Sequence, residues 1–339
     1  MRQLLWIWIL LSIVGPVRAQ NQDSLLARVI FIGDAGQIDA GQTLVIKDAA
    51  AKIIKDKTKV VYLGDNIYPK GMGLPGSQEE LQTKAIMRSQ YVPMRKNGAP
   101  VYFIPGNHDW DHSGRQGLAK IKQQGAFLKE QQDSLLKLLP PDGCPDPIEI
   151  KISDEVTMLI IDSEWWLFPY AKDNKAADCA CSTEQAILTK LAAIVKKNGN
   201  KTILLASHHP FQSYGKHGLR WFFPSPEDLR HQKYQHMVNQ INKAMAGSTR
   251  IIHVAGHDHG LQFIKGKYTQ VVSGSGAKKS AVIKGENSLF ADSRHGYVLA
   301  DVYSGQRIKF RYFVTTARGV EEVFTTIINH HASDNTRSK

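Results

Sequence analysis

Cysteine is scarce in this sequence, with three in 339 residues: Cys144, Cys179 and Cys181. Three cysteines cannot support a small disulfide-rich scaffold, and no further cysteine or nearby histidine completes a zinc set around them. An odd number leaves at least one thiol outside any intramolecular bridge. Two interpretations stay open: a bridge from Cys144 to one of the other two, or surface thiols without a function.

Long apolar runs are absent after the N-terminus. Residues 4–14 are apolar apart from one serine, but this run is shorter than a comfortable membrane span. A positive charge precedes it, and residues 17–19 place small or apolar side chains where a signal peptidase reads them. We expect residues 1–19 to be a cleaved signal peptide, and the mature protein to be secreted or periplasmic. A retained signal anchor is the alternative, although no stop-transfer pattern supports it.

A basic block interleaved with aromatic residues is also absent, so nothing indicates nucleic-acid readout. The net charge is nevertheless +12, which favours anionic partners such as phosphorylated molecules. The sequence has no internal repeat and no linker, and no later run predicts a membrane span. We expect a single domain over residues 20–329 and a polar, disordered tail over residues 330–339. The sequence does not indicate an oligomeric state.

Short apolar runs alternate with longer amphipathic segments, as in an α/β domain. Strands are expected at residues 28–32, 59–63, 100–104, 156–161, 201–206 and 250–254, and helices at residues 41–55, 78–96, 182–197 and 226–246. Ser182-Thr183-Glu184-Gln185 is typical of a capping box at the start of the third helix. The C-terminal part is β-rich, with strands expected at residues 268–273, 296–303, 307–315 and 322–327.

Side chains that bind metals recur directly after five of these strands. The five segments are Gly33-Asp34-Ala35-Gly36, Gly64-Asp65-Asn66-Ile67-Tyr68, Gly106-Asn107-His108-Asp109, Ser207-His208-His209-Pro210 and Gly256-His257-Asp258-His259-Gly260. Open α/β sheets build their sites at the carboxyl ends of strands, so the five turns are expected to converge. Carboxylates, an amide, imidazoles and a phenol without a thiolate suit iron, zinc or manganese. The set is too large for one tetrahedral ion, which predicts two metals.

The spacing of His257 and His259 fits this prediction. In an extended segment the two side chains point the same way, with Cα atoms roughly 6.5 to 7 Å apart, and metals about 3.5 to 4 Å apart could each take one. Taken singly, the first two segments are ordinary turns, and His253 or His295 is a packed or solvated side chain. GNHD and GHDH are stronger signals, because folding alone does not require histidine in those turns.

These five segments together resemble the blocks of the calcineurin-like metallophosphoesterases. Tyr68, three residues after Asp65, resembles the mark of the purple acid phosphatases, including the tartrate-resistant type. Residues 214–218 and 271–276 are also similar to small, single-domain members of that family. The resemblance runs from about residue 29 to about residue 327, and implies a four-layer α/β sandwich of two mixed β-sheets flanked by helices.

The resemblance also implies roles for individual residues. The ferric-site ligands would be Asp34, Asp65, Tyr68 and His259, and the divalent-site ligands would be Asp65, Asn107, His208 and His257, with Asp65 bridging. His208 is preferred to His209 because it lies two residues before Pro210, as the family's ligand does. His108 and His217 match histidines that touch the substrate or the leaving group. The implied cofactors are Fe(III) and a divalent ion, which would be Fe, Zn or Mn.

The implied function is a secreted acid phosphatase that hydrolyses phosphate monoesters by in-line attack of a metal-bound hydroxide. Its partners would be phosphorylated small molecules or phosphoproteins. Two alternatives remain: a phosphodiesterase or nucleotide pyrophosphatase on the same metal pair, and a non-catalytic metal-binding or phosphate-binding surface protein.

Two segments depart from the family pattern. Residues 111–146 are longer and more helical than expected, and residues 163–168 have no counterpart. Trp165 and Trp166, in the second segment, are expected to be core residues, with a substrate-facing wall as the alternative. Both departures concern the substrate rather than the metal site.

Overall fold

The computed structural model describes residues 24–172, 179–220 and 222–330. The signal peptide expected at residues 1–19 and all but the first residue of the expected tail lie outside the described residues. None of the helices in the described ranges is long and apolar enough to cross a bilayer.

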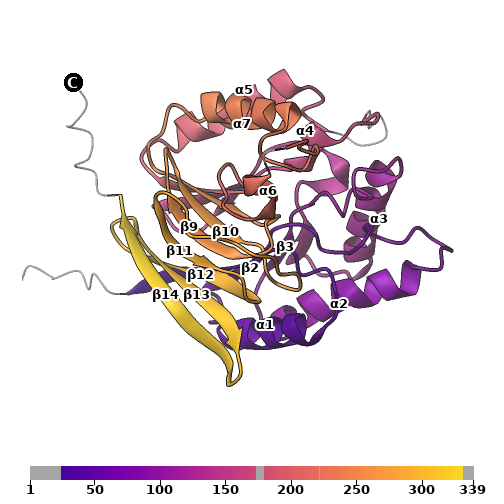
Figure 1. Cartoon of the computed structure of the whole chain (residues 1–339), viewed down its shortest axis with the longest axis horizontal. Helices are drawn as coiled ribbons and strands as arrows, with labels where there is room; N and C mark the ends of the chain where they lie inside the picture. The colour runs from indigo at the N-terminus through magenta and orange to yellow at the C-terminus, as the bar shows by residue number, and fades with distance from the viewer. Residues whose placement is uncertain (1–23, 173–178, 221, 331–339) are drawn as a thin grey trace, which may run out of the picture.

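Two seven-stranded sheets pack face to face, with helices on their outer sides (Figure 1). The first sheet has the order β14 (Gly319–Asn329), β13 (Arg307–Thr316), β12 (Gly296–Tyr303), β1 (Leu25–Ile32), β2 (Thr58–Tyr62), β3 (Val101–Phe103), β4 (Leu136–Leu138). The second has the order β11 (Ser288–Asp292), β9 (Leu261–Lys265), β10 (Thr269–Ser273), β8 (Ile251–Ala255), β7 (Thr202–Ala206), β6 (Val156–Ile160), β5 (Ile148–Lys151).

Both sheets are mixed. In the first, β1 to β4 run parallel and β12 to β14 continue the sheet antiparallel; in the second, β6, β7, β8 and β10 run parallel, while β5, β9 and β11 are antiparallel to their neighbours. The predicted α/β sandwich of two mixed sheets flanked by helices is therefore confirmed.

The helices lie on opposite outer sides of the sandwich. In Figure 1, α1 (Ala40–Ala51) and α2 (Glu80–Lys96) run along the bottom, and α5 (Glu184–Lys197) and α7 (Gln232–Ala244) along the top. α3 (Gly117–Glu130) packs beside β4, and the short helices are η1 (Pro141–Gly143), α4 (Glu164–Leu167) and α6 (Lys216–Leu219).

Burial on both faces explains why the parallel strands have nearly continuous apolar runs. In β1, Val29 and Phe31 join the core between the sheets, whereas Ile30 and Ile32 join the core beneath the helices. Alternate side chains of one strand thus belong to different layers.

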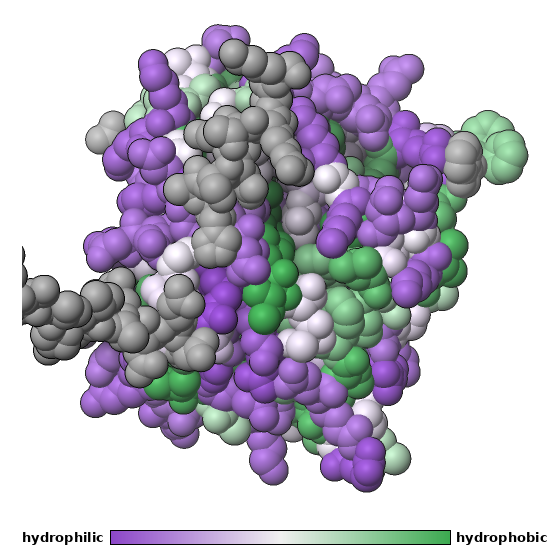
Figure 2. Space-filling view, turned by 90° about the vertical axis from the view of Figure 1, so that its left-hand side faces the viewer, coloured by the Kyte–Doolittle hydropathy of each residue, from purple (hydrophilic) through white to green (hydrophobic). Residues whose placement is uncertain are grey.

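The edge strand β14 lies on the side of the molecule drawn in Figure 2. That side is mainly hydrophilic, with apolar side chains gathered in a band through its middle. Val323 and Ile327 of β14 are partly exposed, but Glu321 and Glu322 lie on the same strand. Charged side chains on an edge strand oppose pairing with another chain.

Several boundaries differ from the sequence prediction, among them the starts of two helices. The helix expected at residues 226–246 begins only at Gln232, and the preceding segment turns toward the carboxyl ends of the strands. α5 is capped by Thr183 rather than Ser182, since the Thr183 hydroxyl accepts a 3.2 Å hydrogen bond from the Ala186 amide. Four short strands, β4, β5, β9 and β11, were not predicted.

Two open questions about side chains are answered. Cys144 and Cys179 form a disulfide, and Cys181 is a buried free thiol. Trp165 and Trp166 are both buried in the core beneath the helices, so the core interpretation is confirmed.

Candidate metal centre

Five turns meet where the two sheets come together. Asp34, Asp65 and Asn107 follow β1, β2 and β3 of the first sheet, while His208 and His257 follow β7 and β8 of the second. The backbone joins them directly, because the Gly256 amide donates to the His208 carbonyl and the His257 amide donates to the Asp34 carboxylate. The predicted convergence is therefore present, and both sheets contribute to it.

Three of the converging residues have left-handed backbone conformations. The φ angles are 58° at Asp34, 53° at Asp65 and 69° at His257. Aspartate and histidine enter this region more often than most other residues, but it is still uncommon, and such conformations cluster at functional sites. The expectation that residues 257–259 form an extended segment is wrong for this reason.

Two glycines let the turns approach so closely. A Cβ atom on Gly64 would lie 2.4 Å from Nδ1 of His208, and one on Gly106 would lie 2.4 Å from Oδ1 of Asp65. Any other residue at either position would push a converging side chain out of place.

Asp34, Asp65, Tyr68 and His259 form one side of the cluster, the tyrosine half. The Tyr68 hydroxyl lies 3.1 Å from Oδ1 of Asp34, 3.0 Å from Oδ2 of Asp65 and 3.2 Å from Nε2 of His259. Nε2 of His259 is 3.5 Å from Oδ1 of Asp34. Four donor atoms thus surround one point.

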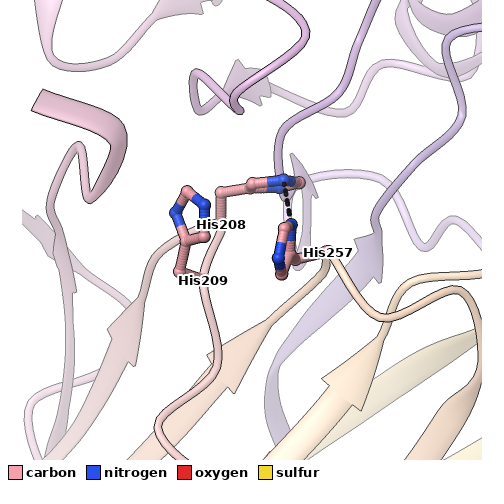
Figure 3. A group of neighbouring side chains, drawn as sticks. All are labelled: His208, His209 and His257. Atoms are coloured by element: carbon pink, nitrogen blue, oxygen red, sulfur yellow. Dashed lines mark hydrogen bonds between the residues drawn. The ribbon is translucent and has the colours of Figure 1, made fainter. Parts of the chain in front are cut away.

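Asp65, Asn107, His208 and His257 form the other side, the histidine half. Nε2 of His208 is 3.4 Å from Oδ1 of Asp65, 3.0 Å from Oδ1 of Asn107 and 3.3 Å from Nδ1 of His257. Figure 3 shows the rings of His208 and His257 pointing toward one another. Asp65 therefore presents one oxygen to each half.

The protonation states of the histidine half suit a cation. Nδ1 of His208 contacts the Leu63 carbonyl at 2.8 Å, and Nε2 of His257 contacts the Glu227 carbonyl at 2.7 Å. A carbonyl only accepts, so each of these nitrogens carries a proton, and in the neutral ring that a metal requires the opposite nitrogen has a free lone pair. Nε2 of His208 and Nδ1 of His257 then carry only lone pairs, and they face each other. Nε2 of His208 also faces the side-chain oxygen of Asn107. A positive ion among them would turn this repulsion into attraction, and mixed N and O donors suit iron, zinc or manganese.

His209 is the less suitable neighbour. Its ring nitrogens lie within 4.8 Å of those of His208 and His257. Its ring, however, turns to the other side of the chain in Figure 3, and Nδ1 contacts the Ser163 hydroxyl at 2.9 Å. The His208 ring thus faces the cluster, whereas the His209 ring faces Ser163.

Burial and charge shift the pKa values of the cluster in opposite directions. Burial alone would raise the pKa of Asp65, but the positive charges of His208 and His108 outweigh it and lower the pKa to about 2. Burial, followed by the charges of Asp34 and Asp65, raises the pKa of Tyr68 well above its usual value. Without a cation, Asp65 is therefore ionised and Tyr68 is a neutral phenol.

The two predicted substrate-side histidines flank the halves. His108 packs against Tyr68, its Nδ1 donates to the Pro69 carbonyl at 2.6 Å, and its Nε2 is 3.9 Å from Oδ2 of Asp65. The His217 ring lies 4.3 Å from that of His257, and its Nδ1 is 2.9 Å from Oδ1 of Asp228.

A group of acidic and histidine side chains beside the histidine half was not predicted from the sequence. Glu227 contacts the Asn107 amide nitrogen at 3.2 Å and Nε2 of His112 at 2.9 Å. Asp228 is fully buried and contacts His217. Both acidic residues were assigned to a helix, although Pro224 and Pro226 just before them are a signal that the chain turns there.

Comparison with known proteins identifies the family. Residues 27–261 match the family model described as calcineurin-like phosphoesterase, whereas a search of curated protein sequences found no match. Among solved structures, GAP50, described as the anchor in the inner membrane complex of Plasmodium, aligns with a TM-score of 0.61 at 18% identity, over 90% of this chain and 89% of that chain.

Two further solved structures also align over 90% of this chain. Purple acid phosphatase PPD1 from yellow lupin (Lupinus luteus) seeds has a TM-score of 0.58 at 16% identity and is covered over 54% of its length. PhoD has a TM-score of 0.57 at 14% identity and is covered over 69%. At these identities the structural likeness shows the fold alone. The family model covers more than half of the chain, and on that match the protein belongs to the calcineurin-like phosphoesterase family.

Proposed function

We propose that this protein is an exported acid phosphatase that uses two metal ions to hydrolyse phosphate monoesters. The observation that carries the proposal is Asp65, whose two carboxylate oxygens face two separate sets of donor atoms. The proposed ligands are Asp34, Asp65, Tyr68 and His259 in the tyrosine half, and Asp65, Asn107, His208 and His257 in the histidine half.

The donor chemistry suggests which ion each half would hold. A phenol loses its proton only near pH ~10, and burial beside two carboxylates makes Tyr68 still harder to ionise. A strong Lewis acid is needed to displace that proton, so we assign Fe(III) to the tyrosine half. The histidine half, with one carboxylate and neutral donors, fits a divalent Fe, Zn or Mn ion.

When bound, the two ions would activate a water molecule and neutralise charge on the phosphate. The chain's own residues do the rest. Asp34 and Asp65 fix the donor geometry through backbone hydrogen bonds, since the Asp65 carboxylate accepts from the His108 amide at 2.9 Å. Such fixed orientation avoids reorganisation during the reaction.

Protonation of the leaving oxygen is assigned to His217 or His108. Asp228 holds Nδ1 of His217, and the Pro69 carbonyl holds Nδ1 of His108, so Nε2 of each ring is left to face the substrate. A histidine held in this way can donate a proton to the leaving oxygen.

Export is supported by the disulfide between Cys144 and Cys179, since disulfides persist mainly in oxidising compartments. The net charge of +12 favours phosphorylated small molecules or phosphoproteins as partners. N-terminal sequencing of protein recovered outside the cytoplasm tests this part: a start near Gln20 supports cleavage of a signal peptide.

The decisive test measures metal content and hydrolysis together. We expect two metal ions per chain, and much faster hydrolysis of 4-nitrophenyl phosphate than of bis(4-nitrophenyl) phosphate. Faster hydrolysis of the diester would favour a phosphodiesterase or nucleotide pyrophosphatase on the same metals. Two bound metals without hydrolysis of either compound would indicate a non-catalytic binding protein, and fewer than two would overturn the ligand assignment.

A further inference from the structure

A cavity of about 750 Å³ adjoins the tyrosine half. Tyr68, Pro69, His108 and His259 form its inner wall. Its outer wall consists of Gly36, Gln37, Ile38, Gln82, Ala85, Ile86 and Lys278. This volume is in the range of small-molecule sites, and is larger than a phosphate group requires.

Lys278 is the one lysine or arginine among the residues lining this cavity. Its ammonium lies 4.7 Å from the centre of the Tyr68 ring and donates to the side-chain oxygen of Gln37. No carboxylate lines the cavity, and no ion pair of Lys278 with a described carboxylate is present. A neutral amide does not cancel the charge, so the cavity attracts anions.

A neighbouring cavity shows the contrast. It shares Tyr68, Pro69 and Gln82, but it also contains Asp111 and Glu79. Its Lys120 forms a 2.9 Å ion pair with Asp111 and donates to the Lys70 carbonyl. That lysine already has an anionic partner, whereas Lys278 has none in the described part of the chain.

We infer that Lys278 binds a second anionic group of the substrate, a carboxylate or phosphate a few bonds away from the phosphate that is hydrolysed. The preferred substrates would be small phosphate monoesters with such a distal anion. The inference rests on the proposed function, because it takes the metal centre as the place where the scissile phosphate binds. Lys278 is then a specificity-determining residue, and the apolar side chains of Ile38, Ala85 and Ile86 accommodate the part between the two anions.

The test compares phenyl phosphate with 4-carboxyphenyl phosphate, which differ only in the distal carboxylate. In Lys278→Gln we expect KM for 4-carboxyphenyl phosphate to rise about tenfold, with KM for phenyl phosphate changed less than about twofold. Lys278→Arg should restore most of the loss because it keeps the charge. Lys279→Gln is the matched control, since its exposed side chain does not line the cavity.

The outcomes separate this inference from the proposed function. An equal loss for both substrates would show that Lys278 serves the scissile phosphate, and no loss for either would show that it binds no part of the substrate; both results overturn the inference. Absence of hydrolysis of both compounds by the unsubstituted, metal-loaded protein would instead overturn the proposed function.

Discussion

The two halves of the metal centre share Asp65 but differ in chemistry and surroundings. The tyrosine half presents two carboxylates, a phenol and one imidazole, and the histidine half presents one carboxylate, an amide and two imidazoles. The side chain of His259 is 24% exposed, whereas His208 is fully buried.

This difference teaches how one cluster can offer two unequal sites. Anionic oxygens concentrate on one side, and neutral donors concentrate on the other. A more highly charged ion is stabilised by the first arrangement, and a divalent ion needs fewer anionic ligands. The surroundings differ in the opposite sense, because the acidic residues Glu227 and Asp228 lie beside the histidine half, while the cavity with Lys278 lies beside the tyrosine half.

Removing the shared residue should disable both halves at once. Asp65→Ala takes an oxygen from each donor set, so we expect loss of both metals and a fall in kcat/KM on the order of 10³-fold or more. Metal analysis and rates with 4-nitrophenyl phosphate check this. Asp154→Ala is the control, because that side chain is 89% exposed and lies in the turn before the amino-terminal end of β6, away from the carboxyl ends of the strands. Retention of one full metal equivalent would show that the halves do not depend on a common ligand.

The support beneath the histidine half can be weakened without removing a proposed ligand. Asp228 accepts hydrogen bonds from the Ser225 amide and hydroxyl and contacts His217. We expect Asp228→Asn to lower kcat roughly 10- to 100-fold with both metals retained, because such partners orient the residues that act on substrate. The pH profile of kcat should change with it. An equal fall in metal content would show that Asp228 supports the metals themselves.

The sequence predicted that these turns converge, because their position depends on local rules. Each of Asp34, Asp65 and Asn107 follows a buried parallel strand and comes directly after a glycine. This pattern places them at the carboxyl end of the sheet, independently of the conformation of the later loops. Whether these residues hold metals stays a proposal. Glu227 was not predicted because its position depends on how one loop folds back over the site. A loop conformation of this kind leaves no periodic pattern in the sequence.

The backbone at His257 illustrates the same limit. Strand spacing assigned residues 257–259 an extended conformation, but contacts from Asp34 and Glu227 hold His257 at positive φ. The disulfide was similarly open, because the choice between Cys179 and Cys181 depends on the path of a loop. Tertiary contacts, rather than local propensity, decide such details.

Tyr68→Phe tests the identity of the ion in the tyrosine half. The unsubstituted, iron-loaded protein should show a visible charge-transfer band from tyrosinate to Fe(III), and the variant should lose it. We expect about a tenfold fall in kcat/KM, because one of four donors is lost and the others stay in place. Tyr62→Phe is the matched control, since its hydroxyl bonds the Gln90 carbonyl. A colourless protein with full activity would favour zinc or manganese in both halves.

The smallest expected effect concerns protons displaced by metal binding, and it compares the halves directly. Burial lowers the pKa of His257 well below its usual value, with the charges of His217 and His209 adding to the shift. Burial also acts to lower the pKa of His259, but its hydrogen bond to Asp34 and the charges of Asp34 and Asp65 outweigh it, and the pKa is raised. At pH 6 the metal-free protein therefore has a positively charged, doubly protonated ring at His259 and a neutral, singly protonated ring at His257.

A metal ion needs the neutral ring, so it must displace the His259 proton, and affinity at the tyrosine half falls as pH falls through the raised pKa. His257→Ala leaves the tyrosine half, and His259→Ala leaves the histidine half. Both metal-free variants are titrated with Zn²⁺ in a calorimeter at pH 6, in buffers of different ionisation enthalpy, so that the heat reports the number of protons released. We expect His257→Ala, which keeps the tyrosine half, to release roughly one more proton per bound metal than His259→Ala. The difference should shrink as the pH rises through the raised pKa of His259. Equal proton release from the two variants at pH 6 would contradict the prediction. The halves would then differ in the type of donor atoms, and not in the charge of their histidines before metal binding.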